Sequence, residues 1–495
     1  MSSLLKLYSP EGFLTFSCIS LLVFNSTFAY NIKFKFPILN FEIFHQVITI
    51  AFITLLLLTN MSIISIGFDF FFFSTIGTQN LKILLLLIFL FFFIIIWRSF
   101  ILQKLNFFEY FIILLIVLAG LLFLISSYNL ISIYLGLEIQ ALGFYILASF
   151  DRTSIFSSES GLKYFISSSL ISGVFLLGAA LIYGSLGTIN LYQIEFLILN
   201  FFEYPINFSF FFFFFGIFLI LNALLFKLVI APFHFWFPQI YDGAPLSSTI
   251  IFSILPKIAL VNLFIQFWSS ISNLIPFVET ILFFIGMYSM SFGIFKMLKQ
   301  KKLKKLYIYS SISNMGLLLC ILIDNTIESI VSVYFFLIIY IIMSFILWTT
   351  FVIVSYNQNK KTLINYPIYL NYFSNLLKQN HIFAISICFV FFSLAAIPPF
   401  VGFLSKIYLY LILIKSYKYE VSVFLIYLGT FGVYYYLKFL KIILFENINT
   451  KQVQNFYPAT YFNIDSTLYS LSLFLLLFLA LEPNFLFYFC YLLFY

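Results

Sequence analysis

Long apolar runs recur along the whole chain and constrain its fold more than any other feature. One of them, LKILLLLIFLFFFIIIW, extends from Leu81 to Trp97, and runs of comparable character follow it. About 20 apolar residues are enough for a helix to cross the hydrocarbon core of a bilayer. Hydrophobic residues make up 63% of the chain and charged residues only 8%. We therefore expect an all-α polytopic membrane protein without a large soluble domain.

Window hydropathy divides the chain at Pro, Gly, Asn and charged residues into about fourteen predicted transmembrane helices. Their predicted ranges are 12–30, 43–66, 81–101, 108–126, 128–150, 157–183, 208–230, 243–270, 275–295, 305–323, 328–355, 382–414, 421–445 and 466–492. The first range lacks a basic leader and a small-residue cleavage site, so we expect it to be a retained span and not a signal peptide.

Basic residues are distributed unevenly between the two alternating sets of loops. Loops after odd-numbered spans carry most of the 25 Lys and Arg residues. This set is Lys33, Lys35, Arg98, Lys104, Arg152, Lys296, Lys299, Lys301, Lys302, Lys304, Lys305, Lys360, Lys361, Lys378 and Lys451, with Lys438 and Lys441 at a span end on the same side. The opposite side has Lys6, Lys82, Lys415 and Lys418. Because basic loops orient membrane helices, the asymmetry supports the span count and predicts that both termini lie on the outer side.

Net charge and composition also exclude some classes of function. The net charge of +8 comes from these short loops, so it does not indicate nucleic-acid binding. Cys18, Cys320, Cys388 and Cys490 are isolated, without the paired spacing of a metal or redox site, and are expected in the core. The 74 phenylalanines are typical of an AT-rich coding sequence. The dense run from Lys296 to Lys305 principally sets topology, with anionic lipid binding as the alternative.

Two predicted spans contain a proline beside a lysine. In 208–230, Lys227 comes five residues before Pro232, and in 382–414 the pair Pro398 and Pro399 precedes Lys406. Proline frees a helical carbonyl, which in a membrane is tolerated within protein or along a watery cavity. An ordinary kink is the alternative for each proline alone. Their recurrence with a lysine favours broken helices along a transport path.

Each break is the fourth helix of a block of five, so the two blocks would be inverted repeats. We accordingly predict four segments along the chain. They are three N-terminal helices in 1–107, a first five-helix repeat in 108–270, a second in 271–445, and a C-terminal loop with the last helix in 446–495.

Charged residues inside apolar runs are the candidate functional residues, because a charge at the centre of a membrane helix costs about 2.5–3.5 kcal/mol on insertion scales. Glu138 lies in the middle of a span, and Lys163 follows after a short loop. We hypothesise an ion pair between them. The alternatives are a hydrogen-bonded structural carboxylate for Glu138 and a lysine that snorkels to the interface for Lys163.

Lys227 and Lys257 are framed by apolar residues, and a desolvated lysine exchanges its proton more readily than an exposed one. His234 could bridge such lysines, because imidazole titrates near neutrality; a hydrogen-bonded histidine at a helix end is the alternative. His45 and His381 lie near span ends and are not expected to form a site. We therefore predict proton translocation through buried charges.

Six ordered segments, within about residues 128–440, resemble one family. They are GLEIQALGFYILASF, ESGLKYFISSSLISGVFLLGAALIYGSLGT, FKLVIAPFHFWFPQIYDGAP, LPKIAL, KKLKKLYIYSSISNMG and SLAAIPPFVGFLSKIY. They are similar to subunit 2 of NADH:ubiquinone oxidoreductase, the respiratory complex I, whose bacterial counterpart is subunit N. The resemblance implies an antiporter-like fold of fourteen helices, with inverted five-helix repeats and broken seventh and twelfth helices.

By motif alignment, the resemblance also implies that the family's charged positions on helices 5, 6, 7, 8 and 12 are filled. The corresponding residues are Glu138, Lys163, Lys227, Lys257 and Lys406. Asn314 stands where relatives often have histidine, and an amide cannot take up a proton near neutral pH. A relay through that position is therefore not expected in this chain.

The resemblance further implies a subunit that moves protons while partner subunits carry the redox chemistry. No cluster ligands, flavin site or dinucleotide fingerprint are recognised in this chain, so FMN, iron–sulfur clusters and ubiquinone are expected in partners. Expected partners are other membrane-arm subunits, antiporter-like ones included, and phospholipids such as cardiolipin. The expected location is the mitochondrial inner membrane with basic loops toward the matrix, or else a bacterial plasma membrane. A subunit of a multisubunit cation/proton antiporter and a purely structural subunit are the alternatives.

Overall fold

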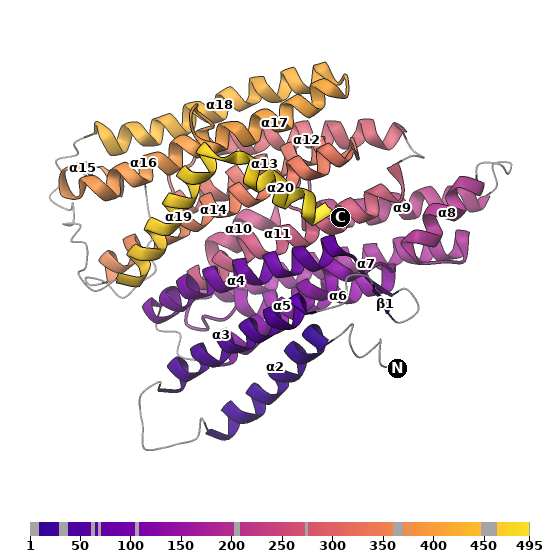
Figure 1. Cartoon of the computed structure of the whole chain (residues 1–495), viewed down its shortest axis with the longest axis horizontal. Coiled ribbons are helices and arrows are strands. Elements are labelled where there is room, and N and C mark those ends of the chain that lie inside the picture. Colours follow the sequence, from indigo (N-terminus) through magenta and orange to yellow (C-terminus); the bar gives the residue numbers. More distant parts are fainter. Residues whose placement is uncertain are drawn as a thin grey trace. The chain divides into compact units, whose positions relative to one another are not determined.

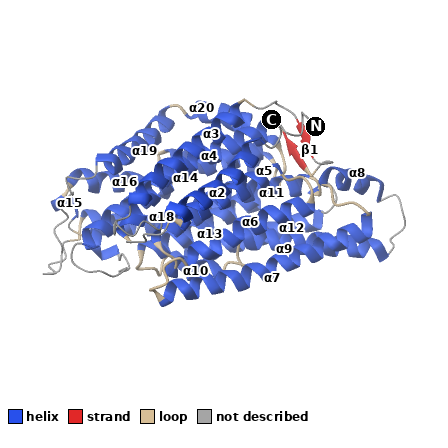
Figure 2. Cartoon of the chain, turned by 90° about the horizontal axis from the view of Figure 1, so that it is seen from below, coloured by secondary structure: helices blue, strands red, loops and turns tan. Residues whose placement is uncertain are grey.

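The structure, a computed structural model, is almost entirely helical (Figures 1 and 2). It describes residues 9–28, 38–60, 65–67, 71–103, 108–201, 208–272, 276–359, 370–374, 376–446 and 463–494. Several basic residues of the predicted loops lie outside the described residues. They are Lys6, Lys33, Lys35, Lys104, Lys360, Lys361 and Lys451.

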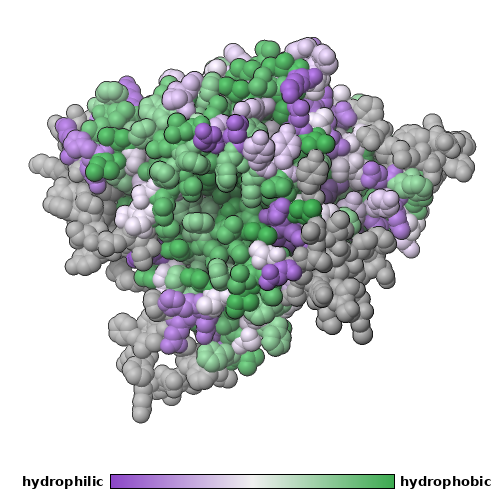
Figure 3. Space-filling model, in the orientation of Figure 1, coloured by the Kyte–Doolittle hydropathy of each residue, from purple (hydrophilic) through white to green (hydrophobic). Residues whose placement is uncertain are grey.

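The prediction of an all-α membrane protein is confirmed. In the described part of the chain, ten helices are long and apolar enough to cross a membrane, and the bent pair Ser466–Leu481 and Pro483–Phe494 is an eleventh candidate. Two shorter apolar helices, Phe211–Lys227 and His381–Ala395, coincide with the two spans for which breaks are predicted. Hydrophobic side chains predominate on the face drawn in Figure 3. The count of about fourteen spans and the inverted repeats stay predictions.

The chain divides into two compact units. The first comprises Met1–Val229, Gln239–Pro276 and Leu492–Tyr495, and the second comprises Ile230–Pro238 and Phe277–Tyr491. The short helix α10 (Trp236–Gly243) has residues in both. The four predicted segments of the chain stay a prediction.

The first unit contains most of the N-terminal helices and one small antiparallel hairpin. Its elements are α2 (Ser9–Phe28), α3 (Ile38–Thr59), β1 (Ser65–Gly67), β2 (Phe72–Ser74), α4 (Ile76–Leu102), α5 (Glu109–Ser126), α6 (Leu130–Ala148), α7 (Ile155–Leu186), α8 (Leu191–Phe201), α9 (Phe208–Lys227) and α11 (Leu246–Ser269). Helix α11 is its most buried span, because it packs against α4, α5 and α6.

The second unit contains the remaining helices, except that the first residue of α12 and the last residues of α20 belong to the first unit. They are α12 (Pro276–Met297), α13 (Leu303–Leu322), α14 (Ile327–Asn359), the 3₁₀ turn η2 (Leu370–Phe373), α15 (Leu376–Gln379), α16 (His381–Ala395), α17 (Val401–Lys415), α18 (Tyr419–Leu444), α19 (Asn463–Leu481) and α20 (Pro483–Phe494). Helix α14 packs against α16, α17 and α19.

The four cysteines of the chain are buried, as expected.

Polar side chains define several helix starts in an otherwise apolar sequence. Thr75 and Thr78 form a capping box at the start of α4, and Asn129 and Ser132 form one at the start of α6. These side chains satisfy backbone N–H groups that have no partner within the helix. Gly187 ends α7 in the left-handed conformation, with φ 73°, where a side chain would be strained.

Helices α7 and α9 cross at two glycines. A Cβ atom on Gly178 would lie 2.8 Å from the carbonyl oxygen of Gly216, and one on Gly216 would lie 2.9 Å from that of Gly178. These distances are shorter than van der Waals contact, so only glycine allows the two backbones to approach so closely. Small residues at such crossings are typical of membrane helices, whose association depends on close packing.

Close contact at glycines also occurs between α12 and α13 in the second unit. A Cβ atom on Gly293 would lie 2.8 Å from the carbonyl oxygen of Tyr309, and one on Gly286 would lie 3.0 Å from that of Gly316. Contacts that advance along α12 recede along α13, so the two helices are antiparallel.

The α7–α9 crossing leads to a prediction about stability. Replacing Gly178 by Leu should lower the free energy of unfolding by about 1–3 kcal/mol, because the side chain overpacks the crossing. Thermal unfolding of detergent-solubilised protein would measure the change.

The matched control is Gly173→Leu in the same helix, because a Cβ atom there has no neighbour within 4 Å. Equal melting temperatures for the two variants would show that the crossing is looser than the structure indicates.

Candidate functional site

Both of the predicted helix breaks have the same local elements. Helix α9 ends at Lys227, Val229 has a positive φ of 62°, and Ala231–Pro232 is a cis peptide before α10 begins at Trp236. A left-handed conformation is rare for a β-branched residue such as valine and occurs mainly at functional sites.

The second break repeats this sequence of features. Helix α16 ends at Ala395, Ala396 has a positive φ of 56°, and Pro398–Pro399 is a cis peptide before α17 begins at Val401. Each break leaves the last carbonyls of a helix without intrahelical donors, and those carbonyls carry the partial negative charge of the helix dipole. The end of each first half-helix is therefore suited to hold a cation.

Lys227 occupies the first of these helix ends. Its side chain is buried, and its Nζ donates a hydrogen bond of 2.5 Å to the Ser168 hydroxyl of α7. The pairing follows from the α7–α9 crossing. Ser168 precedes Gly178 by ten residues, and Lys227 follows Gly216 by eleven, so antiparallel helices with a rise of about 1.5 Å per residue bring the two side chains to the same level.

Glu138 is the carboxylate that acts on Lys227. It lies on α6, and one of its oxygens is buried without a hydrogen-bond partner among the described residues. Its charge interacts with Lys227 and with the phenol groups of Tyr134 and Tyr145 on its own helix. Lys227, in the last turn of α9, thus has a hydroxyl partner and a carboxylate whose charge acts on it, both within the first unit.

Lys163 does not form the ion pair that we hypothesised with Glu138. Its ammonium pairs instead with Glu159, at 2.6 Å, and the two side chains are 45% and 51% exposed. The reason is local, because residues four apart lie on the same face of a helix and meet without any tertiary constraint. An exposed pair of this kind contributes little to stability, so Lys163 can leave it at small cost.

Lys257 lies in the middle of α11, directly after Pro256, and its side chain is buried. Pro256 provides no N–H for the preceding turn of the helix. The amides of Asn262 and Gln266 donate to the carbonyl of Ile125, at 3.4 and 3.3 Å, and tie α11 to the end of α5. These contacts set the position of α11 within the first unit.

Lys406 uses the second helix end, although it belongs to the following half-helix. From α17 its Nζ reaches back to donate a hydrogen bond of 3.4 Å to the carbonyl of Leu394, near the end of α16. Gly402 permits this approach, because a Cβ atom there would overlap with the carbonyl oxygen of Ser393. Both lysines lie beside a helix break, but their partners differ: Lys227 donates to a hydroxyl of α7 and Lys406 to a backbone carbonyl of α16.

His234 is buried in the first break, among residues of the second unit. Its ring centroid lies 4.0 Å from that of Phe292 on α12, and its Nδ1 has no hydrogen-bond partner in the described part of the chain. Lys227 and Lys257 belong to the first unit. The predicted bridge between these lysines through His234 stays a prediction. Asn314 lies partly buried on α13.

The structure also contains a buried ion pair that sequence reasoning missed. Lys82, which we counted on the outer side at the start of the predicted span 81–101, is buried in α4 and pairs with Glu11 of α2, which is 2% exposed. The signal was available, because Lys82 interrupts the beginning of an apolar run and Glu11 precedes another. Ser168, in contrast, lies in the run SSSL, and nothing in the sequence distinguishes it from its neighbours.

A second cluster ties two turns of the second unit together. Lys418 pairs with Asp324, the Ser416 hydroxyl donates to Asp324 at 2.9 Å, and Lys415 pairs with Glu328 at 2.6 Å. These bonds join the turn between α13 and α14 to the turn between α17 and α18. The far end of the lysine-bearing helix α17 is therefore anchored, and its near end lies at the break.

The chain matches one family model and many known proteins. The model, described as NADH:quinone oxidoreductase/Mrp antiporter, transmembrane, matches residues 127–433. NADH-quinone oxidoreductase subunit N of Pelagibacter ubique is 36% identical over 69% of this chain and 70% of its own length. NADH-ubiquinone oxidoreductase chain 2 of Marchantia polymorpha is 34% identical over 70% of this chain and 69% of its own length.

Solved structures share the fold. A chain of respiratory complex I from Thermus thermophilus, with bound aureothin, has a TM-score of 0.75 at 21% identity and covers 97% of this chain and 98% of its own. A chain of the Mrp complex from Dietzia has a TM-score of 0.78 at 16% identity and covers 98% of this chain and 96% of its own. The predicted resemblance is confirmed by these relatives.

The second break leads to a prediction. Replacing Gly402 by Ala should lower the free energy of unfolding by about 1–3 kcal/mol, because the methyl group forces the first turn of α17 away from α16. The Lys406 bond to the Leu394 carbonyl should lengthen with it. Thermal unfolding in mild detergent measures the first effect, and a cryo-EM structure of the variant measures the second.

Gly432→Ala on α18 is the control, because a Cβ atom there would lie at an ordinary contact distance of 4.0 Å from Ile294. An unshifted α17 in the Gly402 variant would contradict the role given to this glycine.

Proposed function

Because the chain belongs to the family of transmembrane subunits shared by NADH:quinone oxidoreductases and Mrp antiporters, we propose that it is the subunit N type, or chain 2, of a respiratory NADH:ubiquinone oxidoreductase and that it carries protons across the membrane. The identity to subunit N and chain 2 relatives over about two thirds of the chain supports this choice within the family.

One observation carries the proton-translocation proposal. Lys227 is buried at the end of half-helix α9, hydrogen-bonded to Ser168 and under the electrostatic influence of Glu138. A buried charge in a membrane helix is costly, and its retention beside a break is typical of ion and proton paths. Lys227 can hold a proton as an ammonium group and release it when its electrostatic partners change.

Lys163 is the residue that we propose as the gate. In this structure its ammonium pairs with Glu159, and Glu138 is free to attract the Lys227 ammonium. Movement of Lys163 toward Glu138 would neutralise that carboxylate and weaken the attraction that retains the proton on Lys227. Each change of about 1.4 kcal/mol in this attraction changes the ratio of protonated to unprotonated Lys227 about tenfold.

The remaining lysines complete the proposed relay. A proton taken up from the basic side would pass from Lys227 by way of Lys257, with His234 and water, to Lys406, and leave on the outer side. Lys406 is suited to be the last proton carrier of the relay, because its ammonium group donates a hydrogen bond to the Leu394 carbonyl at a helix end. Quinone reduction in other subunits would drive the alternation.

In this proposal the chain has no redox centre, and its partner subunits hold FMN, iron–sulfur clusters and ubiquinone. Its neighbours would be membrane-arm subunits, other antiporter-like subunits among them. The proposed location of this multi-pass protein is the mitochondrial inner membrane, with the basic loops toward the matrix. The compositional bias of the chain supports an organelle-encoded origin.

A subunit of a multisubunit cation/proton antiporter is the second candidate function. It is supported by the description of the family model, which covers Mrp antiporters as well as NADH:quinone oxidoreductases. The two candidates share the fold and the buried lysines, so the assembly that contains the chain distinguishes them.

A native gel tests which assembly this is. Membranes would be solubilised in mild detergent and separated, the gel stained for NADH oxidation, and the active band identified by mass spectrometry. We expect peptides of this chain in the NADH-oxidising band. Reproducible recovery in a different complex without NADH-oxidising subunits would favour the antiporter.

Replacement of Lys227 by Met tests the relay. Proton pumping should fall by at least about tenfold, since a group that carries protons contributes a factor of this size or more. Electron transfer should fall with it if the two processes are tightly coupled, whereas the native gel should show normal assembly. Proton uptake per NADH oxidised in sealed vesicles is the measurement.

Lys299→Met is the matched control, because this lysine is exposed between α12 and α13. Wild-type pumping in the Lys227 variant would remove Lys227 from the proton path.

A further inference from the structure

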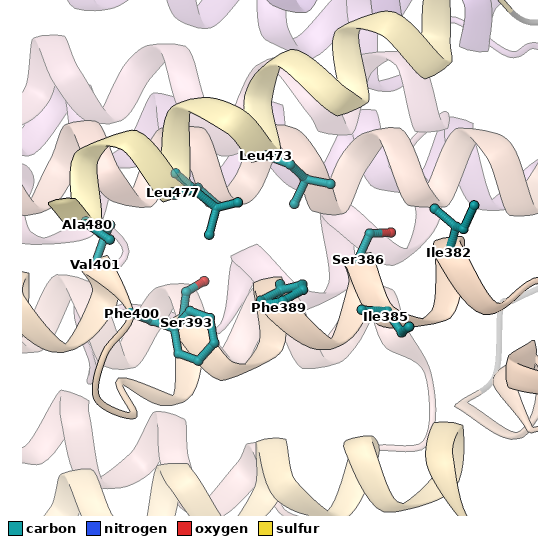
Figure 4. Close-up of a pocket in the computed structure, with 11 residues that line it drawn as sticks. Ile382, Ile385, Ser386, Phe389, Ser393, Phe400, Val401, Leu473, Leu477 and Ala480 are labelled. Carbon is teal, nitrogen blue, oxygen red and sulfur yellow. The ribbon is translucent and has the colours of Figure 1, made fainter.

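An apolar groove lies between α16 and α19 in the second unit (Figure 4). Its volume is about 310 Å³, and it continues past the end of α16 to Phe400 and Val401 at the second helix break. Leu473, Leu477 and Ala480 of α19 form the facing wall. We therefore asked which ligand the lining of this groove, beside the second helix break, would bind.

The polar atoms in the groove already have partners. The Ser386 hydroxyl is hydrogen-bonded to the Tyr469 hydroxyl at 2.8 Å and to the Phe383 carbonyl at 2.8 Å. The Ser393 hydroxyl donates to the carbonyl of Val390 at 2.7 Å. A ligand is therefore offered only apolar contacts, which excludes a polar solute and favours a hydrocarbon chain.

The length of the groove matches one leaflet of a bilayer. Along α16 it extends from Ile382 to Ser393, which at a rise of about 1.5 Å per residue is about 17 Å. Half of a hydrocarbon core about 30 Å thick is about 15 Å. Ile382 and Leu477 are 83% and 49% exposed, so the groove is open along its length to surrounding lipid.

Polar side chains at the α16 start of the groove indicate which lipid head group it would accept. The groove starts in the first turn of α16, where His381 is exposed, and the exposed Lys378 lies just before it on α15. Lys378 belongs to the basic set of loops that the sequence predicts, so we expect this end to face the basic side of the membrane. A lysine ammonium and an imidazole N–H at the mouth of an apolar groove are complementary to the phosphate of an anionic lipid with its acyl chain below.

We propose that this groove binds one acyl chain of an anionic phospholipid from the leaflet on the basic side, with its phosphate beside Lys378 and His381. The far end of the chain contacts Phe400 and Val401, and Val401 begins the half-helix that carries Lys406. The bound lipid thus supports the packing of α17 against α16. Only the consequence for proton transfer rests on the proposed function; lipid binding requires only that the chain spans a membrane.

Photolabelling of the intact complex tests the proposal. The complex is reconstituted into phosphatidylcholine vesicles that contain phosphatidylglycerol with a photoactivatable acyl chain, and labelled peptides are identified by mass spectrometry. We expect labelling of residues 382–401 and 473–480. Leu477→Trp, which fills the groove from a half-exposed position, should reduce labelling about tenfold, the loss expected when about two methylenes are displaced from apolar surface.

Two comparisons make the result specific. Leu475→Trp places the same side chain on α19 outside the groove and should leave labelling unchanged, whereas Ile385→Trp should block the groove from its other wall. Lys378→Gln combined with His381→Gln should reduce labelling by phosphatidylglycerol but not by phosphatidylcholine with the same photoactivatable chain.

Equal labelling in the Leu477 and Leu475 variants would overturn the groove as the binding site. Equal loss for both lipids in the glutamine variant would overturn the anionic head group. Crosslinks from the groove to a partner subunit in place of lipid would show that a protein helix is the occupant. None of these outcomes depends on pumping, so failure of the proposed function would be seen separately.

Discussion

A backbone that is surrounded by lipid must satisfy its own hydrogen bonds, and the arrangement of this protein depends on where that requirement is relaxed. Hydrocarbon offers no partner for a free N–H or carbonyl, so the apolar runs form helices. At the two breaks the helix stops inside its span, and its last carbonyls accept from donors beyond the helix, such as the N–H groups of Val229 and Ala396. Lys227 and Lys406 are found at these two ends. At the second break the Lys406 ammonium and the Leu394 carbonyl satisfy each other, whereas Lys227 finds its partner in the Ser168 hydroxyl of α7.

Close packing determines which side chains can serve these lysines. The crossing of α7 and α9 at Gly178 and Gly216 sets the register that brings Ser168 to Lys227. At the second break, Gly402 allows α17 to begin against the carbonyl of Ser393, and Lys406 then reaches the next carbonyl along. Small residues far apart in the sequence thus position the charged groups, although they carry no charge themselves.

The charged residues differ in how firmly they are held, and this difference is consistent with different roles. Lys227 is buried and bonded to another helix, whereas Lys163 forms an exposed pair with a residue one turn away in its own helix. Breaking an exposed pair costs little, because water replaces the lost interaction. A mobile gate and a fixed proton carrier would be expected to differ in this way. The pair of Glu11 and Lys82 joins α2 to α4, and both of its side chains are buried.

Much of this protein could be determined from the sequence by itself, because hydropathy and the cost of buried charge act locally. Apolar runs of membrane length specify helices, and a lysine beside a proline marks each break before any tertiary contact is known. The family resemblance was likewise carried by local motifs. Only the tertiary structure decided which partners these charges have. Glu159 rather than Glu138 pairs with Lys163, Ser168 accepts the Lys227 hydrogen bond, and Lys82 is buried against Glu11. Such partners depend on helix register and on which helices pack together. A helix that is apolar on every face has no sequence pattern that marks the side facing a given neighbour. Its sequence therefore predicts neither the register nor the partner.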